Sequence, residues 1–229
     1  VYQIHDISVP VNSMCDRAFI AVKAAKGLYE KDVAYYDDSI REKLLLEQQI
    51  GDDMVRALKE EQFDVYFQPK YNLLTGKMAG AEALVRWRHP VKGFMSPAEF
   101  IPIFEKNGFI TELDMYVWNK SCEYIAKWQK KYGKLVSLSV NVSRKDIYKQ
   151  NLPEILKDIV EKNGLKPEIL HLEITESAYT ENQEQLIYIV KQLKKEGFII
   201  EMDDFGSGYS SLNMLAELPI DILKLDMKF

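Results

Sequence analysis

Polar side chains stand at or near the C-terminal ends of four successive strand-like segments in the second half of this sequence. They are Asn141, Glu173, the neighbours Asp203 and Asp204, and Lys224. In a parallel barrel the C-terminal ends of the strands converge on one face, which is where catalytic groups lie in barrel enzymes. We therefore expect these side chains to meet in one polar cluster.

A further carboxylate, Glu82, lies inside the otherwise apolar strand-like segment Ala79–Trp87. Taken singly, such residues are more often helix caps or solvated loop residues, and Asp203-Asp204 before Phe-Gly-Ser-Gly could merely form a turn. Taken together, several carboxylates and a carboxamide are costly to assemble unless a cation neutralises them. Because the candidate ligands are oxygen atoms, the pattern favours a hard divalent ion, Mg²⁺ or Mn²⁺, over zinc.

The segments that must position these residues alternate between strand and helix patterns. Strand patterns occupy Leu135–Val142, Ile169–Thr175, Phe198–Met202 and Ile222–Leu225. Helical patterns lie between them at Pro153–Asn163, Asn182–Glu196 and Ser210–Glu217. Such alternation predicts an α/β fold with a parallel sheet, either an open doubly wound sheet or a barrel. The sequence has no G-x-G-x-x-G or G-x-x-x-x-G-K-[ST] motif, which weakens interpretations that require a nucleotide cofactor.

A predicted hairpin precedes the alternating segments. Phe63–Asn72 and Lys77–Arg88 are strand-like and are joined by a Leu-Leu-Thr-Gly turn, so a barrel here would begin with an antiparallel strand. A capping box at Ser96–Glu99 predicts the start of a helix that ends at Gly108. A second amphipathic helix is expected at about Thr111–Lys131.

The N-terminal residues read as strand, helix, strand. Tyr2–Ile7 has strand character, Met14–Lys26 has a helical apolar face, and Val33–Tyr36 is a short apolar run. So short a segment with one helix cannot bury a core alone, so we expect it to be the tail of a preceding domain. The pattern of Ser39–Glu61 predicts one long helix, which is a packed surface helix, a linker between two units or the first helix of the next domain.

The composition is that of a globular protein. The chain has 229 residues, of which 47% are hydrophobic and 28% are charged, and its formal net charge is −5. This acidity argues against a general nucleic-acid binder or a membrane-surface protein, so we expect no DNA or RNA polymer as a partner. Two widely separated cysteines, Cys15 and Cys122, indicate a reducing compartment. No apolar run approaches the roughly 18–20 residues that cross a bilayer.

The motifs themselves resemble those of a known family. Glu82-Ala83-Leu84 followed by Val-Arg-Trp, with Gln68-Pro69 upstream and an Asp-Asp-Phe-Gly-Ser-Gly-Tyr-Ser-Ser segment from Asp203, is similar to the EAL-domain family. Asn-Val-Ser from Asn141, Glu-Ile-Thr-Glu-Ser from Glu173 and Leu-Lys-Leu-Asp around Lys224 match the remaining motifs in order. The family comprises phosphodiesterases of the bacterial second messenger cyclic di-GMP.

The resemblance divides the chain into three parts. Residues 52–229 resemble the EAL domain, residues 1–38 resemble the C-terminal tail of a GGDEF (diguanylate cyclase-type) domain, and residues 39–51 would form a helical linker. The implied fold is a TIM-like (β/α) barrel with an antiparallel first strand. Residues 52–229 are about 70 fewer than the roughly 250 of a typical barrel, so we expect the barrel to lack its last strands.

The resemblance also implies a site and a reaction. Glu82, Asn141, Glu173 and Asp203 would bind one divalent ion, Mg²⁺ or Mn²⁺, and Asp203 with Asp204 would bind a second. Glu82, Asp203 and Lys224 are the predicted catalytic residues, and Lys224 would orient or deprotonate the attacking water. Gln68 and Arg86 would contact cyclic di-GMP, and the product would be linear pGpG.

Assembly and location follow from the same resemblance. The loop Phe205–Ser211 resembles the family loop that links dimerisation to metal binding, so we expect a homodimer formed through the EAL domain. We expect the protein to lie in the bacterial cytoplasm. It could also be the cytoplasmic part of a membrane-anchored protein whose sensor or membrane domains lie outside residues 1–229. Another glutamate ligand and a glutamine of the family have no counterpart here, so a chain that ends at Phe229 should show little or no turnover. A non-catalytic cyclic di-GMP receptor and a structural fragment of a multidomain signal transducer are the alternatives.

Overall fold

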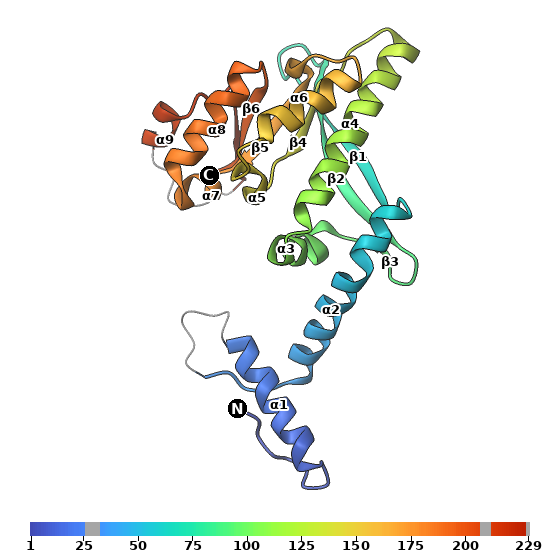
Figure 1. The fold of residues 1–229 in the computed structure, drawn as a ribbon, viewed down its shortest axis with the longest axis vertical. Coiled ribbons are helices and arrows are strands. Elements are labelled where there is room, and N and C mark those ends of the chain that lie inside the picture. Colours follow the sequence, from blue (N-terminus) through green and yellow to red (C-terminus); the bar gives the residue numbers. More distant parts are fainter. Residues whose placement is uncertain (26–32, 207–211, 228–229) are drawn as a thin grey trace. The chain divides into compact units, whose positions relative to one another are not determined.

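The structure is a computed structural model that describes residues 1–25, 33–206 and 212–227. By its internal contacts the chain divides into two compact units, Val1–Val55 and Arg56–Phe229. The elements of both units are drawn in Figure 1. In these described parts of the chain, no helix is both long enough and apolar enough to cross a membrane.

The first unit contains the helix α1 (Val11–Ala25) and most of the long helix α2 (Asp38–Lys59). The structure confirms the prediction of one long helix after residue 38. The predicted strand Tyr2–Ile7 is wrong, because this segment has no regular secondary structure. Its apolar residues Ile4 and Ile7 are 57% and 93% exposed, so the segment has no buried apolar face that would fix it in a sheet.

The second unit is built on one seven-stranded sheet with the order β1-β2-β4-β5-β6-β7, and β3 pairs with β2. β1 and β3 run antiparallel to β2, whereas β2, β4, β5, β6 and β7 are mutually parallel. The strands are β1 (Phe63–Tyr71), β2 (Met78–His89), β3 (Gly93–Met95), β4 (Leu138–Asn141), β5 (Leu170–Thr175), β6 (Ile199–Phe205) and β7 (Ile222–Leu225). The predicted α/β fold with an antiparallel first strand is confirmed.

Helices follow the parallel strands and pack on the sheet (Figure 1). They are α3 (Pro97–Asn107), α4 (Ile110–Tyr132), α5 (Arg144–Ile147), α6 (Leu152–Lys162), α7 (Glu176–Glu181), α8 (Gln183–Lys195) and α9 (Leu212–Glu217), with a 3-10 turn at Pro167–Ile169. α4 contacts β1, β2 and β4, α8 contacts β6, and α6 contacts both α4 and α8. The helices α4, α6 and α8 thus form a continuous layer against the sheet.

Side chains alternate between the two faces of each strand, and this alternation separates the apolar core from a polar face. Leu172 on β5 and Met202 on β6 are fully buried and belong to the apolar face. Glu173 and Asp203, one position further along each strand, point to the opposite face. Neighbouring parallel strands in this register therefore gather their polar side chains on the same side of the sheet.

An aromatic cluster fixes the hairpin of β1 and β2 to α3. Phe63, Trp87, Phe100 and Phe104 are each at most 2% exposed. Their ring centroids lie 5.1 Å apart for Phe63 and Trp87, 5.8 Å for Trp87 and Phe104, and 5.4 Å for Phe100 and Phe104. Gly108 ends α3 with a φ of 93°, a conformation that favours glycine, so the predicted helix end is confirmed.

Several short elements were not predicted from the sequence. β3, α5 and α7 contain three, four and six residues, which is too few for a periodic apolar pattern to show. β4 covers Leu138–Asn141, a shorter segment than the predicted strand Leu135–Val142. The predicted start of the last helix at Ser210 lies outside the described residues, as does Lys26.

Candidate active site

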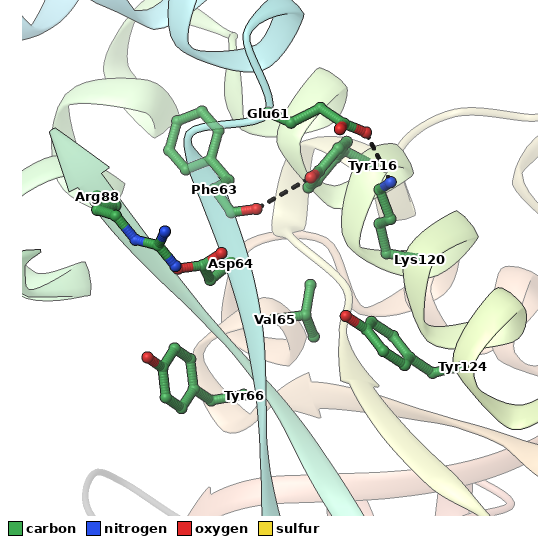
Figure 2. Close-up of a pocket in the computed structure, with 9 residues that line it drawn as sticks. All are labelled: Glu61, Phe63, Asp64, Val65, Tyr66, Arg88, Tyr116, Lys120 and Tyr124. Atoms are coloured by element: carbon green, nitrogen blue, oxygen red, sulfur yellow. Dashed lines mark hydrogen bonds and ion pairs between the residues drawn. The ribbon is translucent and has the colours of Figure 1, made fainter. Parts of the chain in front are cut away.

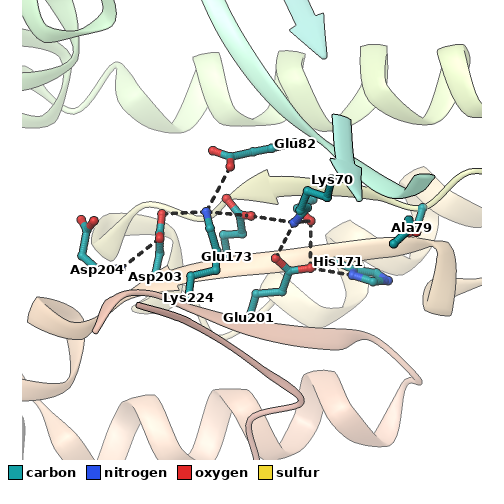
Figure 3. A network of polar contacts seen from close by, with 11 residues as sticks. Lys70, Ala79, Glu82, His171, Glu173, Glu201, Asp203, Asp204 and Lys224 are labelled. Atoms are coloured by element: carbon teal, nitrogen blue, oxygen red, sulfur yellow. Dashed lines mark hydrogen bonds and ion pairs between the residues drawn. The ribbon is translucent and has the colours of Figure 1, made fainter. Parts of the chain in front are cut away.

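Four strands bring one ammonium group and three carboxylates together on the polar face of the sheet (Figure 3). Nζ of Lys224 on β7 lies 3.1 Å from Glu82 Oε2, 3.1 Å from Glu173 Oε1 and 3.0 Å from Asp203 Oδ2. These carboxylates come from β2, β5 and β6. The side chain of Glu173 is fully buried, and those of the other three residues are 19 to 25% exposed. Four residues that were predicted at strand ends or inside a strand thus lie in direct contact.

The three carboxylates have a geometry that fits a metal ion. One oxygen from each of Glu82, Glu173 and Asp203 lies within 4.8 Å of the other two. Oε2 of Glu173 is buried and accepts no hydrogen bond from the described residues, which is a costly state for a carboxylate oxygen. Carboxylate oxygens are ligands that Mg²⁺ and Mn²⁺ prefer. The residues present therefore fit a hard divalent cation.

The protonation states of this group follow from its burial and its charges. Burial raises the pKa of Glu173 to about 7, an effect that the charge of Lys224 opposes and the charge of Glu82 strengthens. Burial alone would lower the pKa of Lys224, but the charge of Glu173 and hydrogen bonds to Asp203 and Glu82 raise it above its ordinary value. Lys224 is thus a cation and a hydrogen-bond donor here, whereas a general base would need the opposite shift.

Asp204 and Asn141 are the other predicted metal ligands. Asp204 follows Asp203 at the end of β6 with a positive φ of 57°, and its backbone N–H donates to Asp203 Oδ1 at 2.9 Å. Desolvation and the charge of Asp203 raise the pKa of Asp204. Asn141 ends β4 as the sheet neighbour of Glu173, and its backbone carbonyl accepts a hydrogen bond from Trp118 Nε1 at 3.0 Å. Asp204 is not part of the close three-carboxylate group.

The two residues predicted to contact a ligand take different positions. Arg86 lines a pocket of about 340 Å³ together with Asn141, and its Nη1 donates to the Val85 carbonyl oxygen at 2.8 Å. Further polar or charged residues that line this pocket are Glu105, Asp114, Ser143, Arg144, Thr175 and Ser177. Gln68 is exposed on β1, directly opposite Glu82 in the strand register, and is not part of the pocket lining.

A second charged network, which was not predicted from the sequence, lies one side-chain layer toward the N-terminal ends of the parallel strands (Figure 3). Lys70 Nζ lies 2.7 Å from Glu201 Oε2 and 3.2 Å from Glu173 Oε1. Burial alone would raise the pKa of Glu201, but hydrogen bonds from His171 and Lys70 hold it well below its usual range. His171 and Glu201 each stand two positions before a predicted site residue on the same strand. Residues two positions apart on a strand lie on the same face of the sheet, so this spacing could have indicated that His171 and Glu201 lie near the site.

A groove of about 370 Å³ lies between β1 and α4 (Figure 2). Its polar side chains already have partners within the groove, because Tyr116 donates to the backbone carbonyl oxygen of Phe63 at 2.9 Å and Lys120 pairs with Glu61 at 2.8 Å. None of the predicted site residues lines this groove. We therefore place the candidate chemistry at the carboxylate group around Lys224.

Comparison with known proteins gives a family match and several relatives. A family model described as EAL domain matches residues 52–229. The cyclic di-GMP phosphodiesterase NbdA of Pseudomonas aeruginosa is 32% identical over 93% of this chain and 27% of the relative. An uncharacterized signaling protein of Caulobacter vibrioides is 34% identical over 91% of this chain and 25% of the relative. The chain spans about a quarter of the length of these curated relatives.

Solved structures with the same fold include complexes with cyclic nucleotides. A structure described as PaMucR phosphodiesterase in complex with c-di-GMP is 34% identical, with a TM-score of 0.74 over 78% of this chain and 72% of that chain. A structure of the EAL enzyme Bd1971 in a form bound to cAMP and cyclic di-GMP is 26% identical, with a TM-score of 0.73 over 94% of this chain and 57% of that chain. The arrangement of strands and helices is therefore shared with these proteins.

Proposed function

The chain belongs to the EAL domain family, and from this membership we propose that the whole protein hydrolyses cyclic di-GMP to linear pGpG with the help of divalent cations. The observation that carries the proposal is the set of three carboxylates from three strands, one of them with a buried oxygen that lacks a hydrogen bond from the described residues. The relative NbdA, named as a cyclic di-GMP phosphodiesterase, supports the choice of substrate.

The proposed cation ligands are Glu82, Asn141, Glu173 and Asp203 for a first Mg²⁺ or Mn²⁺, and Asp203 with Asp204 for a second. Bound cations of this kind supply Lewis-acid polarisation of a phosphodiester. The chain itself supplies the ligands from four neighbouring strands, β2, β4, β5 and β6, whose pairing fixes their positions, so little ordering is needed when the substrate arrives. The choice between Mg²⁺ and Mn²⁺ is open to measurement by comparing their affinities.

Lys224 is proposed to orient the attacking water and to supply a positive charge near the reacting phosphate. The carboxylates of Glu173, Asp203 and Glu82 raise its pKa, and cations bound to these same carboxylates would lower it, as a role in deprotonating the water requires. Arg86 is proposed to bind the phosphate or a guanine edge of the ligand, since its planar fork suits both and it already lines the adjacent pocket. Gln68 is proposed to contact the ligand from β1, beside Glu82.

Replacement of Glu82 tests this function. We expect Glu82→Ala in the whole protein to lower Mn²⁺-dependent formation of pGpG by at least about 100-fold, because it removes a ligand oxygen from the site. Chromatographic detection of pGpG gives the readout, and Glu168→Ala, an exposed carboxylate outside the site, is the matched control. Unchanged turnover in Glu82→Ala would contradict the site. Saturable binding of cyclic di-GMP by the unmodified protein without product would indicate a receptor instead.

We also propose that residues 1–38 are the tail of a GGDEF-type domain, that residues 39–51 form a linker, and that the protein works in the bacterial cytoplasm. The helix α2 runs through residues 39–51 and supports a helical linker there. A GGDEF motif encoded just upstream of Val1 would support the first assignment, and its absence would contradict it. Fractionation of cells between cytoplasm and periplasm would test the proposed location.

A homodimer formed through the EAL domain is proposed as well. The loop that motivates this proposal, Phe205–Ser211, is described at Phe205 and Gly206, and residues 207–211 lie outside the described part of the chain. Light scattering after size-exclusion chromatography should give twice the mass of one chain for the whole protein. A single-chain mass at micromolar concentration would contradict the dimer.

A further inference from the structure

The ion pair of Lys70, whose side chain is 32% exposed, with the buried Glu201 lies directly beside the proposed cation ligand Glu173. The ammonium group of Lys70 bridges two carboxylates, at 2.7 Å from Glu201 Oε2 and 3.2 Å from Glu173 Oε1. It also donates a hydrogen bond to the hydroxyl group of Ser139. Lys70 therefore holds one oxygen of Glu173, and the other oxygen, Oε2, is the one without a hydrogen bond from the described residues.

Glu201 is fixed from several sides and is fully buried. Its Oε1 accepts hydrogen bonds from Ser139 Oγ at 2.8 Å and from His171 Nδ1 at 2.6 Å. Its Oε2 accepts a hydrogen bond from Lys70 Nζ at 2.7 Å. A buried carboxylate with this many donors is held rigidly and keeps its charge. Glu201 does not contact Lys224, so it is not part of the group that Lys224 joins.

The charges explain why a carboxylate is needed at this position. An ammonium group 3.2 Å from Glu173 would repel a cation bound to the same carboxylate, and this repulsion is stronger in a partly buried site than in water. Glu201 lies even closer to Lys70 and offsets its charge. Together, Lys70 and Lys224 join four carboxylates, Glu82, Glu173, Glu201 and Asp203, into a network with a formal charge of −2, which favours a divalent cation.

We propose that Glu201 is a positioning residue of the cation site, which acts through Lys70. Lys70 orients the Glu173 carboxylate, and Glu201 cancels the charge of Lys70 so that this orientation does not weaken cation binding. His171 and Ser139 hold Glu201 in place. The inference rests on the proposed function in one respect, namely that Glu173 is a cation ligand.

Mn²⁺ affinity, measured by isothermal titration calorimetry on the unmodified protein and its variants, tests the inference without an activity assay. We expect Glu201→Gln, which keeps the shape and removes the charge, to weaken Mn²⁺ binding by roughly 10- to 100-fold, the range typical for residues behind metal ligands. Adding Lys70→Met to Glu201→Gln removes the unbalanced charge of Lys70. The double variant should therefore bind Mn²⁺ at least tenfold more tightly than Glu201→Gln alone. The surface variant Glu168→Gln is the control and should bind as the unmodified protein does.

The double variant separates charge compensation from simple structural support. If Glu201 only stabilised the fold, removing Lys70 as well would not improve Mn²⁺ binding. Mn²⁺ affinity of Glu201→Gln within threefold of the unmodified protein, or no recovery in the double variant, would overturn the inference. If Glu201→Gln does not fold, as judged by circular dichroism, the double variant decides. An affinity within tenfold of the unmodified protein supports the inference, and a larger loss overturns it.

The two proposals fail in different ways. If the unmodified protein does not bind Mn²⁺ at all, both the cation site and the role of Glu201 are overturned. If the unmodified protein binds Mn²⁺ and loses binding in Glu82→Ala but not in Glu201→Gln, the cation site stands and the role of Glu201 is wrong. Both measurements use the same titration.

Discussion

Lys224 offsets the mutual repulsion of three carboxylates that lie on three different strands. Its ammonium group lies within 3.1 Å of each of them, and its side chain is 25% exposed. Removing one partner of a largely buried ion pair leaves the other charges uncompensated, which is more costly than the pair itself is stabilising. The residue is therefore important for stability whenever no other cation is bound.

From this arrangement we predict that Lys224→Met lowers the free energy of unfolding by about 2 kcal/mol in the presence of a chelator, a value reduced for the partial exposure of the group. We expect Mn²⁺ to raise the melting temperature of the variant more than that of the unmodified protein, because the cation takes over the compensation of charge. Thermal unfolding with EDTA and with Mn²⁺ measures both effects.

The matched control is the lysine of a more exposed ion pair. Lys157 pairs with Glu196 at 2.7 Å, and their side chains are 42% and 32% exposed. Lys157→Met should lower the free energy of unfolding by less than about 1 kcal/mol. It should not change the effect of Mn²⁺ on the melting temperature. Equal effects of Mn²⁺ on the melting temperatures of both variants would contradict a special role of Lys224 at the carboxylate group.

At the scale of elements, α4 and α5 meet through a buried pair of carboxyl groups. Asp114 accepts a hydrogen bond from the Ser143 backbone N–H at 3.1 Å, and Ser143 Oγ donates to Asp146 Oδ2 at 2.5 Å. Burial raises the pKa of Asp114 well above its ordinary value, and the hydrogen bond and charge of Asp146 raise it further. The folded protein therefore binds a proton on Asp114 more tightly than the unfolded chain does.

This raised pKa gives the stability a defined dependence on pH. The contribution of Asp114 is fully present below its unfolded pKa of about 3.9 and is lost as the pH rises toward the folded pKa, because the unfolded state then binds fewer protons than the folded state. We predict that Asp114→Asn flattens this fall, so that the free energy of unfolding of the variant relative to that of the unmodified protein increases as the pH rises above about 4. Urea unfolding at several pH values measures the difference. Asp158→Asn, an exposed position on α6, should give a curve parallel to that of the unmodified protein.

The aromatic cluster on α3 allows a prediction about packing. Phe104 is fully buried and contacts Phe63, Trp87, Phe100 and Phe109. Phe104→Ala should lower the free energy of unfolding by about 3–5 kcal/mol, since it removes a buried ring and leaves a cavity. Phe94 is 58% exposed, so Phe94→Ala should lower the free energy of unfolding by less than about 1 kcal/mol. Similar losses in chemical denaturation of the two variants would contradict the assignment of this cluster to the core.

The elements that the sequence predicted well are those with enough residues to show a period. The alternation of strands and helices after residue 134, the hairpin at the start and the helix that ends at Gly108 all follow from local patterns. The network of Lys70 and Glu201 was not predicted, because it depends on the register between strands. Glu201 meets Glu173 only because these two are sheet partners in β6 and β5, and no pattern within one strand fixes that pairing.

At the scale of the whole molecule, the chain consists of two compact units with separate sources of stability. The second unit, Arg56–Phe229, contains the seven-stranded sheet, the aromatic cluster and the carboxylate group. The first unit packs Tyr2 edge to face against Tyr36, with ring centroids 5.7 Å apart, and Arg17 donates to the hydroxyl of Tyr2 at 2.7 Å. These contacts lie within the first unit and support its own elements.

We therefore predict that removal of residues 1–37 leaves the second unit intact. A chain of residues 38–229 keeps all of α2 and should melt within about 3 °C of the unmodified protein, which corresponds to roughly 1 kcal/mol for a domain of this size. Its Mn²⁺ affinity should agree within twofold, because the carboxylate group and the Lys70 network come entirely from β1, β2, β4, β5, β6 and β7. Differential scanning calorimetry and Mn²⁺ titration of both chains give the comparison. A fall of more than about 10 °C in the melting temperature would show that the first unit contributes to the stability of the sheet, and the two units would then have to be treated as one folding unit.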